Sequence, residues 1–251
     1  MSITGERDDL PGGGPQKAGI AIADVMTGMY ATIAILSALE HRSVSGRGQY
    51  IDMALLDCIV ALGGNQVTGY FASGKVPGRF GNAHASLVPY QVFVVADGEI
   101  VVAVGNDGQW QQYCAAIERS DLGADPRWTK VTGRITGRDE LVPELARTML
   151  TRTRAEWLER LESRGVPCGP INNYREVFED AQVQHRKLRV DLQRPDGSMV
   201  STIASPLRLQ GTPPVYDRAP PTLGDATEDV LGSLLGLSSE EIARHRANRI
   251  I

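Results

Sequence analysis

The chain has 251 residues, of which 42% are hydrophobic and 22% charged, with 27 glycines, 14 prolines and a net charge of −4. This composition excludes a collagen, a coiled coil and a wholly disordered chain, and the length allows one large domain or two small ones. The slightly acidic balance argues against nucleic-acid binding, which needs a basic surface to neutralise phosphates.

Targeting and membrane signals are weak. The first twenty residues hold acids and a Gly/Pro run where a signal peptide has an apolar core. The apolar stretches Gly19–Leu39 and Ile51–Leu62 are interrupted by Asp24, Asp52 and Asp57, so we expect no membrane span. The three cysteines lie far apart without a C-x-x-C pair, which indicates reduced thiols and no metal site. These signals predict a cytoplasmic protein that binds no membrane.

The first predicted elements follow a polar, Gly/Pro-rich loop over residues 5–19. Apolar residues at helical spacing predict a long helix over Val25–Leu39, apolar on all sides and in need of cover. Gln49–Met53 alternates like a short strand, and Ala54–Tyr70 is typical of a second apolar helix. A turn-rich linker, Gly69–Pro89, marks a domain boundary.

A mixed block of helices and strands is predicted next. Asp97-Gly98 joins two apolar runs, Tyr90–Ala96 and Glu99–Val104, as a β-hairpin. Three helices are expected after it, the last opened by a capping box that pairs Thr153 with Glu156. Their ranges are Asp107–Glu118, Glu140–Leu150 and Arg154–Ser163.

The C-terminal part is predicted to be a helix, a hairpin, a Pro-rich strap and two final helices. Asp196-Gly197 is the turn of the hairpin, and Ser238 forms a second capping box with Glu241. The predicted ranges are Asn173–Arg186, Leu188–Leu192 with Met199–Ile203, Thr212–Leu223, and helices beginning near Thr227 and Ser238.

Several common catalytic motifs are missing. Residues 12–17, GGGPQK, lack the Gly-Lys-Ser/Thr ending of a phosphate-binding P-loop, and Gly46-Arg47-Gly48 lacks the third glycine of a dinucleotide fingerprint. The sequence has no G-x-S-x-G elbow and no H-E-x-x-H helix. Hydrolase and metalloprotease functions therefore have no motif support.

Asp24 is the strongest candidate for chemistry. It precedes the long apolar helix, with Thr27-Gly28 in the first turn. One interpretation is an N-cap, because aspartate often accepts hydrogen bonds from free helix amides. The other is a nucleophilic carboxylate, kept ionised by the helix N-terminus and shielded from water by apolar neighbours. The two interpretations are compatible.

A loop over residues 79–86, RFGNAHAS, is the second candidate. Its small residues would let backbone amides approach a ligand and stabilise an oxyanion, although a flexible linker explains the glycine equally well. His84 alone is more typical of a satisfied histidine than of a base. The three tryptophans are expected in the core, and Gly165–Asn173 is expected to brace the fold.

Motifs spread over nearly the whole chain resemble class III CoA-transferases, a family that includes acyl-CoA racemases. They begin with Ala23-Asp24 and Thr27-Gly28-Met29 and continue in Ser45-Gly46-Arg47-Gly48-Gln49-x-Ile51-Asp52. Further matches are Gly81-Asn82-Ala83-His84, Val88-Pro89-Tyr90-Gln91-x-Phe93, Gly105-Asn106-Asp107, Gly165-Val166-Pro167-Cys168-Gly169-Pro170-Ile171-Asn172 and Pro220-Pro221-x-Leu223-Gly224. The pattern is most similar to the subgroup that moves CoA between dicarboxylic acids.

The resemblance implies an α/β fold with a partial Rossmann-like large domain and a smaller α+β domain. The large domain would hold residues 1–75, the small domain 76–204, and a Pro-rich strap with helices would return to the large domain over 205–251. Asp24 matches the catalytic aspartate of the family. Gly81, Asn82, Ala83 and His84 match the glycine-rich loop that closes over the acyl intermediate.

The resemblance also implies the chemistry and the partners. A carboxylate attacks an acyl-CoA thioester to give a mixed anhydride, and the returning thiolate makes an enzyme-bound thioester that passes CoA to an acceptor acid. The loop would exclude water from the anhydride. Coenzyme A and acyl-CoA act as substrates with no permanently bound cofactor or metal, and the family forms homodimers.

One departure from the family pattern leaves alternatives open. Family members carry a long upstream segment that supplies part of the large domain and most of the CoA pocket, whereas this sequence begins just before Asp24. The chain is therefore expected to be a shortened transferase or a non-catalytic fragment. A racemase or epimerase is a further alternative, but it needs a second acid/base group, generally histidine. His41, His185 and His245 lie among charged residues and look like parts of solvated helix faces.

Overall fold

The structure, a computed structural model, describes residues 2–251, and the chain divides after Ile171 into two compact units. Helices dominate, and two small antiparallel sheets accompany them, so the predicted mixture of α and β structure is confirmed. The first unit contains α1 (Ile22–Ser45), α2 (Leu55–Leu62), α3 (Gly64–Ser73), β1 (Tyr90–Val95), β2 (Gly98–Ala103), α4 (Asp107–Ala116), α5 (Ser120–Ala124), α6 (Val131–Thr136), α7 (Arg138–Met149), α8 (Arg154–Glu162) and β3 (Cys168–Pro170).

Helix α1 is the long apolar helix that the sequence predicts. It runs for 24 residues and ends at Gly46, whose left-handed backbone lets its amide donate to the Arg42 carbonyl at 2.9 Å. None of its residues is buried within the described part of the chain. By length and composition alone α1 could cross a membrane, with a mean hydropathy of 1.6. The core helix of a soluble protein passes the same test, so the expectation of no membrane span stays a prediction.

Helices α2 and α3 replace the single helix predicted over Ala54–Tyr70. The break falls at Gly63, whose amide donates to the Val60 carbonyl at 3.0 Å, and at Gly64, which has a positive φ of 48°. The strand predicted over Gln49–Met53 is wrong, because this segment has no strand partner among the described residues and stays without regular structure. An extended segment becomes a strand only when a neighbour completes its hydrogen bonds.

The hydrophobic core of the first unit lies around a three-stranded sheet in the order β1-β2-β3. The hairpin predicted at Asp97-Gly98 is confirmed, with Val95 opposite Gly98 and Tyr90 opposite Ala103. Strand β3 pairs with β2 through Gly169 opposite Val101, so the segment expected to brace the fold completes the sheet. The three tryptophans are buried, as predicted: Trp110, Trp128 and Trp157.

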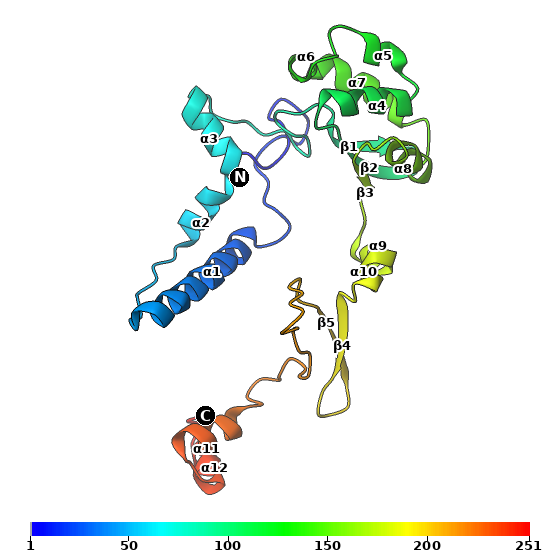
Figure 1. Ribbon diagram of the computed structural model, residues 1–251. Coiled ribbons are helices and arrows are strands. Elements are labelled where there is room, and N and C mark those ends of the chain that lie inside the picture. The colour runs from blue at the N-terminus through cyan, green and yellow to red at the C-terminus, as the bar shows by residue number, and fades with distance from the viewer. Residues whose placement is uncertain (1) are drawn as a thin grey trace. The chain divides into compact units, whose positions relative to one another are not determined.

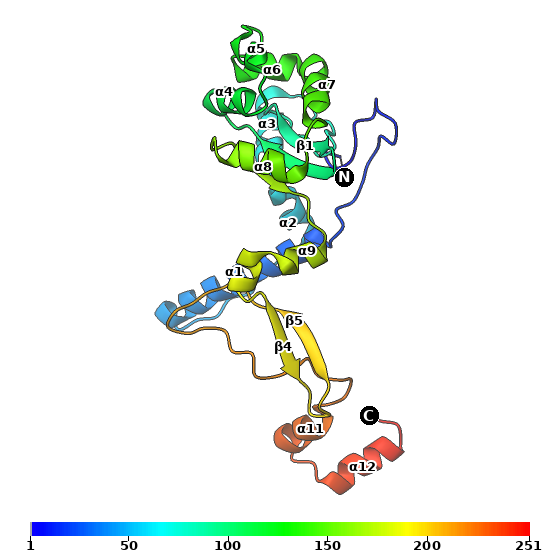
Figure 2. The same cartoon turned by 90° about the vertical axis from the view of Figure 1, so that its right-hand side faces the viewer.

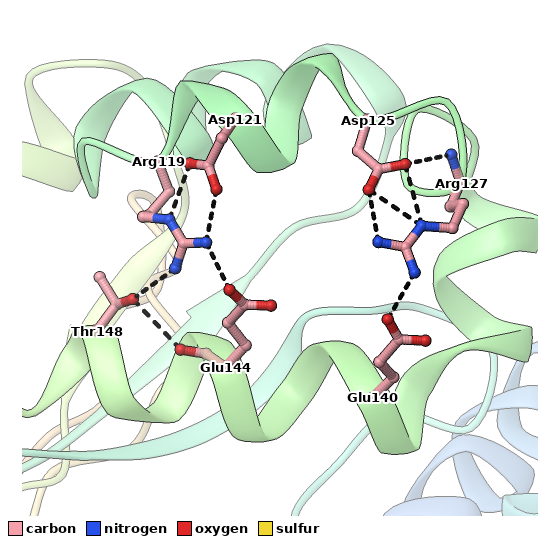
Figure 3. Close-up of polar contacts among 7 residues, drawn as sticks. All are labelled: Arg119, Asp121, Asp125, Arg127, Glu140, Glu144 and Thr148. Atoms are coloured by element: carbon pink, nitrogen blue, oxygen red, sulfur yellow. Dashed lines mark hydrogen bonds and ion pairs between the residues drawn. The ribbon is translucent and has the colours of Figure 1, made fainter.

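Helices α7 and α8 pack against this sheet, α4 packs against α8, and α5 and α6 pack against α4 and α7, respectively (Figure 2). Two arginines outside α7 tie it to the segment before it: Arg119 binds Glu144 at 2.6 Å, and Arg127 binds Glu140 at 2.6 Å (Figure 3). Each arginine also holds an aspartate two residues away in sequence. Helices α5 and α6 were not predicted, because they are only five and six residues long and show no extended apolar period.

The second unit contains α9 (Tyr174–Glu179), α10 (Ala181–His185), β4 (Arg189–Gln193), β5 (Met199–Ile203), α11 (Thr227–Leu235) and α12 (Ser239–Ala247). The hairpin β4–β5 and the capping box of Ser238 with Glu241 are confirmed. The helix predicted over Asn173–Arg186 is split, because the Asp180 side chain accepts hydrogen bonds from the Gln182 and Val183 amides and starts α10. The domain limits expected at 75/76 and 204/205 stay predictions.

Candidate functional site

Asp24 lies in the first turn of α1, three residues after the N-cap position. The N-cap position belongs to Ala21, and no side chain caps this helix end. The interpretation of Asp24 as the N-cap is therefore wrong. The chain turns into the helix at Ile20 and Ala21, whose carbonyls accept from the Ile22 and Val25 amides at 2.9 and 3.1 Å. A carboxylate in the first turn is still stabilised by the helix dipole.

The Asp24 side chain borders an apolar cavity of about 730 Å³. Among the described residues in its lining, Asp24 is the one carboxylate and Lys17 is the one cation. Asp24 is exposed, and within the described part of the chain its carboxylate makes no hydrogen bond or ion pair. The apolar walls come from α1, α2, α3 and the segment just before α1: Ile20, Ile22, Ile59, Val60, Leu62, Val67 and Val76.

An unpaired carboxylate beside an apolar cavity suits a nucleophile. No donor among the described residues occupies its lone pairs, so the carboxylate is available for attack on a bound acyl group. No histidine borders this cavity in the part of the chain that the structure describes. The second acid/base group that a racemase needs is therefore absent from the described lining.

The glycine-rich loop follows α3 and leads into β1. Gly81 has a positive φ of 60°, which glycine adopts readily, and its amide donates to the Gly5 carbonyl at 2.9 Å. The Asn82 Oδ1 accepts from the Val92 amide at 3.3 Å and so fastens the loop to β1. These two hydrogen bonds connect the loop to the N-terminal segment and to β1.

His84 is held by three contacts. Its amide donates to the Tyr90 carbonyl at 2.8 Å, its ring stacks on Tyr90 with 5.2 Å between centroids, and Nδ1 accepts from the Ser86 amide at 3.0 Å. These contacts fit the prediction of a satisfied histidine. With Nδ1 used as an acceptor, the proton of the neutral ring lies on Nε2.

Asp24 and the glycine-rich loop do not share a cavity in this structure. Asn82 and Ala83 border a second cavity of about 500 Å³, together with Phe80 and Arg138. The N-terminal residues border both spaces: Ser2 to Thr4 line the first, and Glu6, Arg7, Asp9 and Leu10 line the second.

Arg138 holds the glycine-rich loop and was not predicted from the sequence as a site residue. Its Nη2 donates to the His84 carbonyl at 2.6 Å and to the Ala85 carbonyl at 3.2 Å. Burial lowers the pKa of its guanidinium, which still remains a cation because an arginine does not lose its proton in proteins. The helical spacing of Leu141 and Leu145 places Arg138 on the buried face of α7, and this spacing was the signal available in the sequence.

Comparison with known proteins gives the family. CoA-transferase family III matches residues 1–227. The chain is 42% identical to the succinate–glutarate CoA-transferase of Agrobacterium fabrum over 93% of its own length, and 36% identical to the succinyl-CoA:mesaconate CoA-transferase of Haloarcula hispanica over 92%. Among solved structures it resembles a CAIB/BAIF family protein from Brucella suis, with 38% identity, 93% of this chain covered and a TM-score of 0.76.

These matches cover only part of each relative. The chain spans 58% and 57% of the two transferases and 60% of the Brucella suis chain. The similarity extends over nearly all of this chain, including α1, the glycine-rich loop and the sheet of the first unit, and it agrees in sequence and in fold. The chain therefore belongs to CoA-transferase family III.

Proposed function

We propose that the protein containing this chain transfers CoA between dicarboxylic acids and that Asp24 is the nucleophile. The observation that supports this most directly is that the unpaired Asp24 carboxylate lines an apolar cavity. The relatives add the substrate class, since their names pair succinate with glutarate and succinyl-CoA with mesaconate.

The reaction proceeds through two kinds of acyl intermediate on Asp24. The carboxylate oxygen attacks the thioester carbonyl of the donor acyl-CoA, the C–S bond breaks, and CoA leaves as the thiolate. The product is a mixed anhydride of the donor acid and Asp24. The thiolate then attacks the aspartyl carbonyl of this anhydride, which releases the donor acid as a carboxylate and leaves Asp24 as a CoA thioester.

The second half repeats these steps in reverse with the acceptor. The acceptor carboxylate attacks the Asp24 thioester, releases the CoA thiolate and forms a new mixed anhydride. Attack of the thiolate on the acceptor carbonyl gives the acceptor acyl-CoA and regenerates the Asp24 carboxylate. Both anhydrides hydrolyse in water, so the loop of Gly81, Asn82, Ala83 and His84 is proposed to exclude water from them.

The remaining partners follow from the same chemistry. Coenzyme A takes part as substrate, with no permanently bound cofactor or metal, and the protein works in the cytoplasm as a homodimer. The apolar surface of α1, exposed along the whole helix, supports an assembly that covers it. The alternative of a racemase is weaker, because the described residues around Asp24 include no histidine.

The test is CoA exchange by the purified protein that contains this chain. Succinyl-CoA and glutarate are incubated with wild-type chain, Asp24→Asn and Asp57→Asn, and the CoA esters are separated by mass spectrometry. Asp57 is a matched control, because it is also an exposed acid in the first turn of an apolar helix, α2. We expect glutaryl-CoA from the wild type and from Asp57→Asn, and a loss of at least about 1,000-fold in Asp24→Asn, since removing a nucleophile removes the covalent route.

A second readout follows the intermediate itself. Hydroxylamine cleaves an aspartyl thioester and leaves a hydroxamate on Asp24. Because NHOH replaces OH, the peptide that contains Asp24 becomes about 15 mass units heavier than the peptide with the free acid. Product formation by Asp24→Asn at the wild-type rate, or no product from the wild-type protein that contains this chain, would overturn the proposal.

A further inference from the structure

The glycine-rich loop is attached to α7 through Arg138. The Arg138 Nη2 donates to two consecutive carbonyls, His84 at 2.6 Å and Ala85 at 3.2 Å, and the guanidinium lies 5.1 Å from the centre of the Phe80 ring. One side chain therefore contacts both ends of the loop. The Arg138 residue is 9% exposed, so these contacts are made largely away from water.

Arg138 has no carboxylate partner in an ion pair within the described part of the chain. Its sequence neighbour Asp139 is paired with Arg7 at 2.6 Å. Burying a cation costs free energy unless hydrogen bonds replace its water, and here the replacements are carbonyls of the loop. The position of the loop and the solvation of Arg138 therefore depend on each other.

The other side of the loop is attached to the N-terminal loop, which we define as residues 4–16. Its two ends are joined by a hydrogen bond from the Gln16 amide to the Thr4 carbonyl at 2.9 Å. The Gly5 carbonyl accepts from the Gly81 amide at 2.9 Å, and Asp8 forms an ion pair with Arg79. The first residues of the N-terminal loop are thus bonded to the first residues of the glycine-rich loop.

The carboxylate of Glu6 lies directly against Gly81. A Cβ at position 81 would be 2.6 Å from Glu6 Oε2, which is closer than such atoms approach. The ion pair of Arg7 with Asp139 ties the N-terminal loop in turn to α7. The N-terminal loop, the glycine-rich loop and the start of α7 are therefore joined to one another pairwise.

We infer that Arg138 is a positioning residue that sets the conformation of the glycine-rich loop, with the N-terminal loop as the second support. This inference rests on the proposed function, in which the loop excludes water from the acyl intermediate. Loss of the Arg138 contacts frees the His84 and Ala85 carbonyls, so the loop samples open conformations and water reaches the anhydride. Transfer then gives way to hydrolysis of acyl-CoA.

The first experiment measures the loop without reference to activity. Hydrogen exchange is followed by mass spectrometry in the wild-type chain, Arg138→Gln, Arg138→Lys and Arg147→Gln. Arg147 is the matched control, because it is an exposed arginine on the same helix. We expect the amides of residues 81–86 to exchange about tenfold faster in Arg138→Gln, since hydrogen bonds from a charged donor are lost.

The pattern across the chain separates positioning from a loss of stability. We expect the amides of β1 and β2 to exchange at the wild-type rate in Arg138→Gln. In residues 81–86, the exchange rate of Arg138→Lys should fall between those of Arg138→Gln and the wild type, and that of Arg147→Gln should match the wild type. Arg7→Gln, at the more exposed ion pair, is expected to speed exchange in residues 4–16 more than in 84–86. Unchanged exchange in residues 81–86, or an equal rise over β1 and β2, would overturn the inference.

The second experiment measures the partition of succinyl-CoA between transfer and hydrolysis. We expect the ratio of free CoA to glutaryl-CoA to rise about tenfold in Arg138→Gln and to recover partly in Arg138→Lys. A structural defect alone would lower both products together and leave their ratio unchanged, and that result would contradict the inference. Transfer by Asp24→Asn would refute the proposed function instead, while the exchange data on residues 81–86 would still decide the role of Arg138.

Discussion

Arg134 is a cation with no exposed surface inside the core of the first unit. Its Nε donates to the Val88 carbonyl and its Nη1 to the Trp128 carbonyl, both at 2.8 Å, and Nη2 binds Asp107 at 3.1 Å. The guanidinium also lies 5.1 Å from the Trp110 ring. One side chain thus satisfies two carbonyls from separate segments and links them to the start of α4.

Replacing Arg134 with methionine should destabilise the first unit strongly. The two carbonyls would lose their donors inside the core, at a cost of about 3 kcal/mol or more in the free energy of unfolding. Urea denaturation followed by tryptophan fluorescence measures this change. Lys130→Ala is the control, because Lys130 is 76% exposed and 3.6 Å from the same Asp107, so its loss should stay within about 0.5 kcal/mol. An equal effect of both substitutions would contradict the central role of Arg134.

Asp24 shows what residue-level reasoning from the sequence could and could not provide. Its candidacy followed from its place before an apolar helix and from the family motif, and the structure places it beside an apolar cavity. The cap role failed because helix entry depends on the backbone at Ala21, whose φ of −76° and ψ of 71° the residue types do not reveal. Arg138 was missed because its partners, the carbonyls of His84 and Ala85, are 54 and 53 residues away in sequence.

Capping boxes begin α8, α9 and α12 among the described helices, and the hydroxyl boxes of α8 and α12 differ in what their helices pack against. In α8 the Thr153 hydroxyl accepts from the Glu156 amide and the Glu156 carboxylate accepts from the Thr153 amide, and Ser238 with Glu241 repeats this arrangement in α12. Helix α8 buries Trp157 and Leu161 in the core of the first unit. The box therefore stabilises that core, whereas the box of α12 stabilises a helix of the second unit.

Thr153→Ala should lower the free energy of unfolding of the first unit by about 1 kcal/mol, the usual cost of removing an N-cap side chain. Tryptophan fluorescence during urea denaturation reports on it, since the three tryptophans are all buried in this unit. Ser238→Ala removes the same kind of cap and should leave this transition unchanged. A shift of similar size in both variants would mean that the two units unfold as one.

Elements with local signals were predicted, and elements that depend on distant partners were not. The Asp-Gly hairpins and the two capping boxes are confirmed because a few adjacent residues specify each of them. Strand β3 has three residues and exists only because β2 pairs with it. The absent strand over Gln49–Met53 is the opposite case, a suitable pattern without a partner among the described residues.

Helix α1 leaves a long apolar surface without cover in the described chain. Val25, Met29, Ile33 and Leu36 follow one another at helical spacing, and all are more than half exposed. Soluble proteins seldom expose a continuous apolar stripe of this kind, because its burial against another surface is favourable by about 25 cal/mol per Å². The proposed homodimer is one source of such cover.

The purified chain should therefore self-associate through α1. Sedimentation velocity over a range of concentrations should show dimers or larger species for the wild type, and the double substitution Ile33→Glu with Leu36→Glu should shift the chain toward monomer by placing two charges in the stripe. Leu150→Glu is the matched control, because Leu150 is similarly exposed at 51% but lies just after α7, outside the stripe. It should leave the association unchanged.

A wild-type chain that stays monomeric at every concentration, or a double variant that associates as strongly as the wild type, would show that α1 does not drive assembly. In that event the apolar stripe would need cover from a different protein surface, and the homodimer proposed for the active enzyme would have to form elsewhere on the chain.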